Sequence, residues 1–177
     1  MIELSTLQAV REIVTIVGVI AGLSYYVLTV QNATKARKTQ VLMQLRDRAT
    51  SKEWLKDFSE LLESEWTDYD DYRRKYIATQ NSDFYAKRYA MWEYLDGVGY
   101  LLHENLIDRE SLYSLSQGMG AVVMWRKWKT IVEEQRKAYD YPDWWVWFEY
   151  LAEEMSKMRV ERGHSPHVID VDGYIKT

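Results

Sequence analysis

One stretch decides the architecture of this chain of 177 residues, namely IVTIVGVIAGLSYYVLTV at residues 13–30. It lies within a longer gap in charge, because no Asp, Glu, Lys or Arg occurs between Glu12 and Lys35. As a helix, the 22 residues of this gap extend about 33 Å, and the hydrocarbon core of a bilayer is about 30 Å thick. Length and hydropathy therefore predict a transmembrane helix at residues 13–34.

Two alternatives compete with this interpretation. A core helix of a soluble protein usually has a polar face, whereas only Thr15, Ser24 and Thr29 interrupt this apolar stretch. A cleaved signal peptide has a basic N-terminal region, an apolar segment of about 7–15 residues and a small-residue cleavage site. Here the apolar segment is longer and no Ala-x-Ala site follows it, so we expect an uncleaved signal anchor.

The charges beside the span predict its orientation. Lys35, Arg37 and Lys38 follow it closely, whereas Arg11 alone precedes it. An excess of Lys and Arg marks the cytoplasmic side of a membrane. We therefore expect a single-pass protein of the cell membrane, with residues 1–12 outside and the main domain in the cytoplasm. The basic flank formed by Lys35, Arg37 and Lys38 can also attract anionic lipid headgroups of the bilayer.

Gly18 and Gly22 form a G-x-x-x-G pair on one face of the span. Small residues at this spacing allow two helix backbones to approach closely, which favours self-association within the membrane. The pattern also arises by chance in apolar segments, and then the glycines have an ordinary lipid-facing or packing role.

Beyond the span, apolar residues return every three or four positions, as in α-helices. The first helix is expected to continue from the span through Leu45, and a second to begin near Ser51 with a Thr50–Glu53 capping box. Further helices are expected at residues 70–76, at residues 83–104, and from Asp108 toward Tyr139. A last helix is expected to begin at Pro142, with Trp144 on a buried stripe. The sequence thus predicts an all-α fold, with an N-terminal transmembrane helix followed by a cytoplasmic helical bundle of about four to five helices at residues 35–160. Residues 161–177 are expected to form a flexible C-terminal tail.

Four segments carry a resemblance to a known group of proteins. They are GLSYYVLTVQN at residues 22–32, YDDYRRKY at 69–76, YLDGVGYLLHENLID at 94–108, and residues 125–155. Together they resemble an uncharacterised prokaryotic family of single-span, membrane-anchored, all-helical proteins, defined by a domain of unknown function. The resemblance implies topology and fold, and it implies no catalytic residue, cofactor or activity.

Composition and motifs argue against most enzyme classes. The chain has no cysteine, which excludes thiolate metal sites and a cysteine nucleophile. Its net charge is −4, which is not the electrostatic character of a nucleic-acid binder. It contains no P-loop, H-E-x-x-H motif or recognisable Ser-His-acid set. We therefore expect no enzymatic activity, no cofactor and no nucleic-acid partner.

Two patterns resemble binding sites without having their full geometry. His164 and His167, with Asp170 and Asp172, are the one cluster that could pass for metal ligands, but Pro166 separates the histidines and no helix fixes them. We therefore expect no metal site. The pairs GVG at 97–99 and GMG at 118–120 lack the third glycine of a dinucleotide-binding loop, and they favour close helix crossings instead.

The 8 tryptophans and 14 tyrosines are most dense in DWWVWFEY, residues 143–150. Trp144, Trp145 and Trp147 cannot share one face of a helix, because successive residues point about 100° apart. They are therefore a candidate partner surface, and the alternative is a core built from large aromatic side chains. The leading hypothesis is a membrane-anchored, non-enzymatic interaction or scaffold protein that binds a protein partner or a second copy of itself. The alternatives are an accessory subunit of a membrane complex, or a membrane-bound enzyme with a carboxylate-lined cleft.

Overall fold

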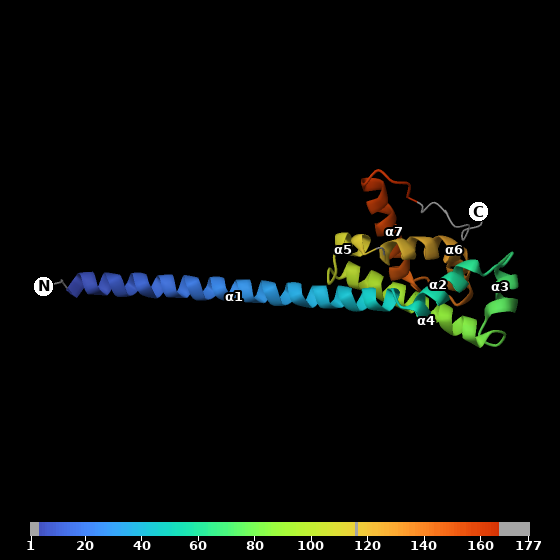
Figure 1. Ribbon diagram of the computed structural model, residues 1–177, viewed down its shortest axis with the longest axis horizontal. Coiled ribbons are helices and arrows are strands. Elements are labelled where there is room, and N and C mark those ends of the chain that lie inside the picture. The colour runs from blue at the N-terminus through green and yellow to red at the C-terminus, as the bar shows by residue number, and fades with distance from the viewer. Residues whose placement is uncertain (1–3, 116, 167–177) are drawn as a thin grey trace. The chain divides into compact units, whose positions relative to one another are not determined.

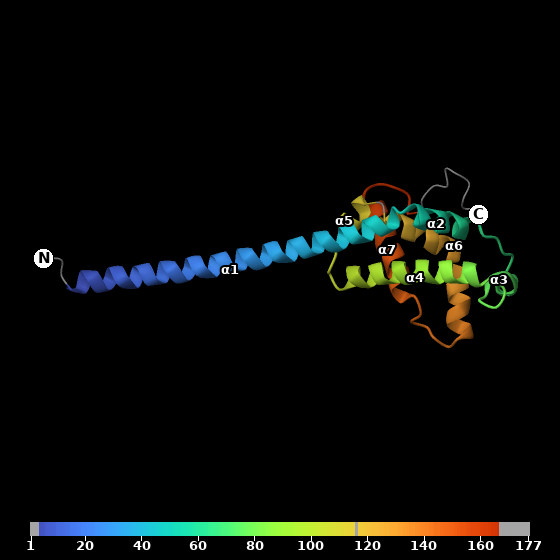
Figure 2. The same cartoon turned by 60° about the horizontal axis from the view of Figure 1, so that its bottom comes forward.

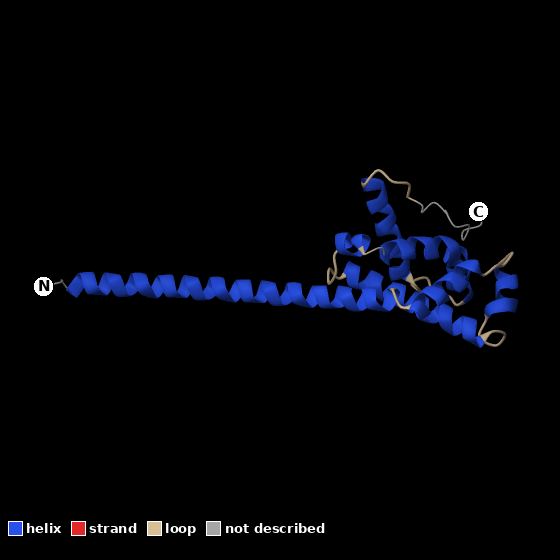
Figure 3. Ribbon diagram, in the orientation of Figure 1, coloured by secondary structure: helices blue, strands red, loops and turns tan. Residues whose placement is uncertain are grey.

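The computed structural model describes residues 4–115 and 117–166. Within these ranges the chain forms seven α-helices and no strand, so the predicted all-α class is confirmed (Figure 3). The helices are α1 (Leu4–Ala49), α2 (Lys52–Glu63), α3 (Tyr69–Tyr76), α4 (Ser82–His103), α5 (Arg109–Ser114), α6 (Gln117–Ala138) and α7 (Val146–Glu161). Six described helices follow α1, which is more than the four or five expected. The chain divides into an N-terminal unit, Met1–Val41, and a helical unit, Leu42–Thr177.

The helix α1 carries the apolar stretch with its side chains exposed. It is long and apolar enough to cross a membrane, and none of its most apolar segment is buried. Ile13, Val14 and Leu23 are each at least 60% exposed. A core helix of a soluble protein would bury such side chains. The helix α1 is therefore compatible with a membrane anchor, and equally with a signal sequence near the N-terminus.

Polar side chains begin most of the other helices. Asp68, Asn81 and Asp108 each accept a hydrogen bond from the backbone N–H three residues later. The start of α2 differs from the prediction by one residue. Ser51 caps this helix, whereas the Thr50 hydroxyl donates to a carbonyl of α1 at 3.0 Å.

The prediction of a single helix from Asp108 toward Tyr139 is wrong. The helix α5 ends at Ser114, and α6 begins at Gln117. The break allows α5 to contact both α6 and α7, and it places Leu112 fully inside the core. The apolar periodicity continues across the break, so the periodicity alone could not reveal it.

The last helix also begins later than the sequence predicts. Its expected first turn contains Pro142 and Trp144, but α7 begins at Val146. Trp145 has a left-handed backbone conformation, with φ at 61°, which a right-handed helix cannot include. Pro142 and Trp144 therefore lie in the turn that precedes α7.

The helix α7 is central to the helical unit. It contacts α4, α5 and α6, and Figures 1 and 2 show it crossing α4 steeply, with α2 packed beside α4. Its buried side chains are Phe148, Leu151, Ala152, Met155 and Met158. The buried side chains of α4 and α6 include Met91, Trp92, Leu95, Trp125, Trp128 and Ile131. The core is thus made largely of aromatic rings, methionine and leucine, packed around α7.

Gly99 sets the closeness of the crossing between α4 and α7. A Cβ atom built on Gly99 would overlap the backbone carbonyl of Trp147, which cannot move without shifting α7. By contrast, a Cβ atom on Gly97 meets nothing within 4 Å. The two glycines of one G-x-G pair therefore have different roles, and only Gly99 is needed for the crossing.

This difference predicts opposite effects of two matched substitutions. Gly99→Ala should lower the free energy of unfolding by about 1–3 kcal/mol, because the added methyl overpacks the crossing. Gly97→Ala should raise it by about 0.5–1 kcal/mol, since alanine is the better helix former at an open position. Chemical denaturation of the purified variants measures both changes. Equal effects of the two substitutions would contradict the assignment of Gly99 to the crossing.

Candidate functional site

The predicted site residues of α1 lie on open surface within the N-terminal unit. No atom lies within 4 Å of a Cβ built on Gly18 or Gly22. Lys35 and Arg37 are exposed, and Lys38 is partly exposed. Self-association through Gly18 and Gly22, and the attraction of lipid headgroups by the basic flank, therefore stay predictions.

The structure separates the three tryptophans of the predicted partner surface. Trp145 is only 3% exposed, and its ring packs edge-on against Trp92 at 5.6 Å between centroids. Trp144 and Trp147 are partly exposed. Trp147 lies against the ring of His103, at 4.3 Å between centroids. Trp145 therefore belongs to the core, because its left-handed backbone turns it inward, and it is not available to a partner.

Two tyrosines outside the predicted partner surface join Trp144 on the surface. Tyr139 is 65% exposed and Tyr141 is 54% exposed. Both contact the Trp144 ring, with centroids at 5.2 Å and 6.2 Å respectively. Residues 139–144, called here the aromatic loop, thus expose three neighbouring aromatic rings. The density of aromatic residues in YDYPDW, residues 139–144, is the signal in the sequence that could have revealed them.

The backbone of the aromatic loop and of Trp145, the residue that follows it, is strained and firmly held. Asp140 and Trp145 have positive φ angles of 50° and 61°, a conformation that costs about 1–3 kcal/mol per non-glycine residue. Arg136 holds the loop, because its Nε donates to the carbonyl of Trp144 at 2.8 Å. Its Nη1 donates to Glu149 of α7 at 2.7 Å, within an ion pair that is largely shielded from solvent. The loop is therefore tied to both α6 and α7.

Asp96 fixes the beginning of α7 from the neighbouring helix α4. Its Oδ1 accepts hydrogen bonds from the backbone N–H groups of Trp147 at 3.0 Å and Phe148 at 2.9 Å. No side-chain cap from Trp145, the residue that precedes α7, serves these groups, so Asp96 acts as a cap supplied through the tertiary structure. Burial raises the pKa of Asp96, against the lowering effect of the two N–H donors. The sequence showed only an acid within a predicted helix.

Arg88 of α4 lies inside the core among aromatic rings. It is 2% exposed, and its guanidinium carbon lies 4.4 Å from the centroid of Trp92 and 4.9 Å from that of Tyr85. Tyr72 lies at 6.0 Å on the same criterion. Burial lowers the pKa of Arg88 and raises that of Tyr72 to about 12. The burial of this arginine is not evident from the sequence, because periodicity does not distinguish a buried charge from an exposed one.

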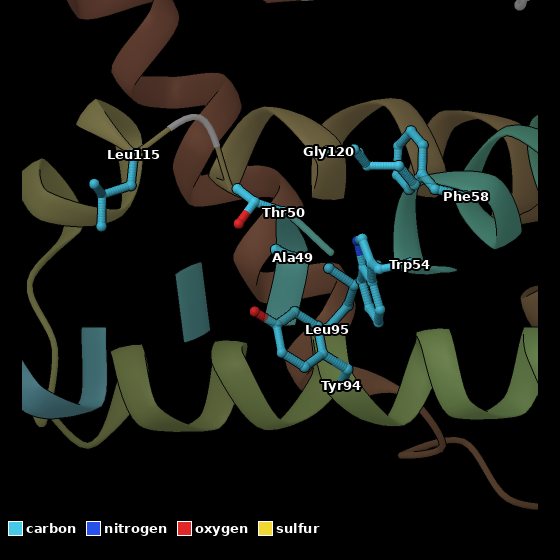
Figure 4. Close-up of a pocket in the computed structure, with 9 residues that line it drawn as sticks. Ala49, Thr50, Trp54, Phe58, Tyr94, Leu95, Leu115 and Gly120 are labelled. Carbon is cyan, nitrogen blue, oxygen red and sulfur yellow. The ribbon is translucent and has the colours of Figure 1, made fainter. Parts of the chain in front are cut away.

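An apolar cavity of about 290 Å³ opens between α2, α4 and α6. Figure 4 shows Trp54 of α2 beside Tyr94 of α4, and Phe58 of α2 beside Gly120 of α6. The Tyr94 hydroxyl is occupied, since it donates to the carbonyl of Leu45 at 2.8 Å. The lining contains no Asp or Glu, so this cavity does not provide the carboxylate-lined cleft considered from the sequence.

A second hollow of about 350 Å³ is more polar. It is lined by Arg48, Ser51, Glu53, Trp54, Asp57, Lys87, Ala90 and Met91. Among the described residues, no group of three or more His, Cys, Asp or Glu side chains is placed to hold a metal ion. The candidate ligands His167, Asp170 and Asp172 lie outside the described residues.

Comparison with known proteins identifies one family. The sequence model of a domain of unknown function, DUF4760, matches residues 12–155. This match agrees with the expected resemblance to an uncharacterised family, and it extends from α1 into α7. No curated protein and no solved structure matches the chain.

The cap supplied by Asp96 generates a prediction with a matched pair of variants. Asp96→Ala should lower the free energy of unfolding by about 2 kcal/mol, because two N–H groups of α7 lose their acceptor. Asp96→Asn should lower the free energy of unfolding by less, since the amide oxygen can accept the same hydrogen bonds. Thermal denaturation of both variants at constant ionic strength measures these effects. Equal losses would show that Asp96 does not act through its acceptor oxygen.

The same pair tests the pKa of Asp96. Because its pKa is raised in the folded state, protonation of Asp96 favours folding. This contribution is fully present below the ordinary aspartate pKa of about 3.9 and is lost as the pH rises through the raised value. The stability of Asp96→Asn relative to the unsubstituted protein should therefore increase between these pH values.

Proposed function

Because the chain belongs to the DUF4760 family, whose domain has no assigned function, we propose its role from its own geometry. The helix α1 anchors the protein in the cell membrane, and the helical unit is a non-catalytic interaction module in the cytoplasm. The aromatic loop binds a protein partner, or a second copy of the chain. Exposure of the apolar side chains along α1 is the observation that carries the anchor.

The polar side chains of the apolar stretch support its placement in a bilayer. The hydroxyl of Thr15 donates to the carbonyl of Arg11 at 2.9 Å, and that of Thr29 donates to Tyr25 at 2.8 Å. A hydroxyl that bonds back to its own helix carries no unsatisfied donor into hydrocarbon. The two threonines are therefore compatible with lipid on all sides of the helix.

The basic flank supports the proposed orientation. Lys35, Arg37 and Lys38 lie within one turn of each other directly after the apolar stretch. Positive side chains near the end of a span favour the cytoplasmic side and attract anionic headgroups. The helical unit, which follows this flank, then lies in the cytoplasm. Gly18 and Gly22 remain available for a second copy of the helix within the bilayer.

The aromatic loop supports binding to a protein. Tyr139, Tyr141 and Trp144 are large amphipathic side chains, the types that dominate the binding energy of protein interfaces. The loop is tied to α6 and α7 through Arg136, so little conformational entropy is lost when a partner orders it further. An accessory subunit of a membrane complex would use the same surface, with its complex as the partner.

Extraction from membranes tests the anchor. The full-length protein should remain in the membrane pellet after an alkaline carbonate wash and retain the mass of the intact chain. The double variant Val17→Arg and Ile20→Arg should lose this retention, because each charge at the centre of a span costs about 2.5–3.5 kcal/mol. Met43→Arg, an exposed apolar position of α1 beyond the span, is the matched control. A mass that lacks the apolar stretch would identify a cleaved signal sequence and contradict the anchor.

Cysteine labelling tests the orientation, since the chain has no cysteine of its own. In intact cells, a membrane-impermeant maleimide should label Gln8→Cys and should label Glu104→Cys only after lysis. The reverse pattern would place the helical unit outside.

Substitution of the aromatic loop tests partner binding. After gentle purification from native membranes, the double variant Tyr141→Ala and Trp144→Ala should recover at least about tenfold less of a stoichiometric partner, or of the homo-oligomer, than the unsubstituted protein. Val160→Ala removes a comparably exposed apolar side chain of α7 elsewhere and should change nothing. A melting temperature unchanged by the substitutions confirms that the fold is intact. Equal recovery of the partner with all variants would remove the loop from the interface.

A further inference from the structure

The apolar cavity between α2, α4 and α6 offers few polar groups to an occupant. Among the described residues, no charged side chain lines it. Its two hydroxyl groups are engaged within the chain, since Thr50 donates to the carbonyl of Arg46 at 3.0 Å and Tyr94 donates to that of Leu45 at 2.8 Å. A buried water molecule needs about two to four polar partners, so a cavity of this kind favours a hydrocarbon over water.

The cavity is large enough for one hydrocarbon chain. Its volume of about 290 Å³ is close to the lower limit of small-molecule sites, which is about 300 Å³. An apolar protein cavity of about 150 Å³ binds benzene, so on the same scale this cavity has room for about twelve carbon atoms. It therefore fits a single alkyl chain of medium length, and it is too small for both chains of a membrane phospholipid.

An arginine without an anionic partner lies beside two rings of the lining. The guanidinium carbon of Arg48 lies 5.3 Å from the centroid of the Tyr94 ring and 5.8 Å from that of Trp54. No acid in the described part of the chain forms an ion pair with Arg48. Its side chain is exposed, so a ligand can reach it. The cavity thus has an available positive charge next to its aromatic wall.

The polar hollow of about 350 Å³ adjoins the apolar cavity, because Trp54 lines both. Its two cations are Arg48 and Lys87. Lys87 is already occupied, since its Nζ lies 2.9 Å from a carboxylate oxygen of Glu60 and 2.6 Å from one of Asp83. Arg48 is therefore the cation of the hollow that is free to bind an anionic headgroup.

Two acids restrict the charge of that headgroup. Glu53 and Asp57 also line the polar hollow, and they repel a group that carries a second negative charge. A carboxylate carries one charge and matches the planar guanidinium of Arg48 with two parallel hydrogen bonds. A carboxylate therefore suits the hollow better than a phosphate does.

We propose that the apolar cavity binds the alkyl chain of one medium-length fatty acid, whose carboxylate pairs with Arg48 in the polar hollow. The alkyl chain packs against Trp54, Phe58 and Tyr94, which line the cavity. Burial of its CH₂ groups supplies most of the affinity, and Arg48 selects the acid over uncharged chains. The site is separate from the aromatic loop and from the apolar stretch of α1, so it does not rest on the proposed function.

Photo-crosslinking of the full-length protein tests the site. The protein is purified in digitonin, which has no alkyl chain to compete for the cavity, and it is irradiated with dodecanoate that carries a diazirine at the end of its chain. Peptide mass spectrometry should find the label on residues of the lining, such as Trp54 or Phe58, and excess dodecanoate should remove it. Label confined to the apolar stretch of α1, or label that excess dodecanoate does not remove, overturns the proposal.

A matched pair of glycine variants tests the cavity. A Cβ atom on Gly120 would make an ordinary contact with the Phe58 ring, at 3.5 Å, so a larger side chain there extends into the cavity. Gly120→Leu should therefore abolish the label that dodecanoate removes. Gly97→Leu, the same substitution at an open position of α4, should leave this label unchanged. A folded Gly120→Leu variant with full labelling refutes the assignment of the ligand to this cavity.

A second pair of variants tests the charge. Arg48→Gln should raise the dodecanoate concentration that halves the label about tenfold, because a charge-assisted hydrogen bond is lost. Arg46→Gln, at an exposed arginine of the same helix, should not. Dodecanol has the same chain without the charge, and it should compete equally for both forms of Arg48. These exposed positions keep the test decisive if circular dichroism shows that Gly120→Leu is unfolded. Equal competition by dodecanoate in Arg48→Gln and the unsubstituted protein contradicts the pairing.

Discussion

The hydrogen bonds from Trp147 and Phe148 to Asp96 are the contacts on which the helical unit depends. They provide the first N–H groups of α7 with an acceptor that the residue before the helix does not supply. One turn further along α4, Gly99 lets the two backbones approach. Because α7 also contacts α5 and α6, the position of this crossing determines where most of the core forms.

The crossing also decides which aromatic side chains face solvent. A helix that begins at Val146 requires the chain to turn sharply at Trp145, whose ring then enters the core beside Trp92. Trp144 stays outside with Tyr139 and Tyr141. The exposed aromatic surface and the buried aromatic core are therefore two consequences of one backbone turn. Arg136 stabilises that turn through the Trp144 carbonyl and Glu149.

Features that depend on neighbours in sequence were predicted well. The all-α class, the long apolar helix α1 and the approximate positions of α2, α3 and α4 follow from short-range spacing. The predictions that failed concern breaks: the turn between α5 and α6, and the late start of α7. In both cases apolar spacing continues through the break. Packing against distant helices, which a periodic pattern does not encode, decides where the chain turns.

The sequence by itself determined the apolar helix α1, because a gap of 22 residues without charge leaves few other structures open to it. It also determined that aromatic residues concentrate near residue 145. Only the tertiary structure decided that Trp145 is core, that Asp96 caps a helix 51 residues away, and that Arg88 is buried among rings. These outcomes depend on distances between residues far apart in the chain, and each residue's own type is compatible with either an exposed or a buried position.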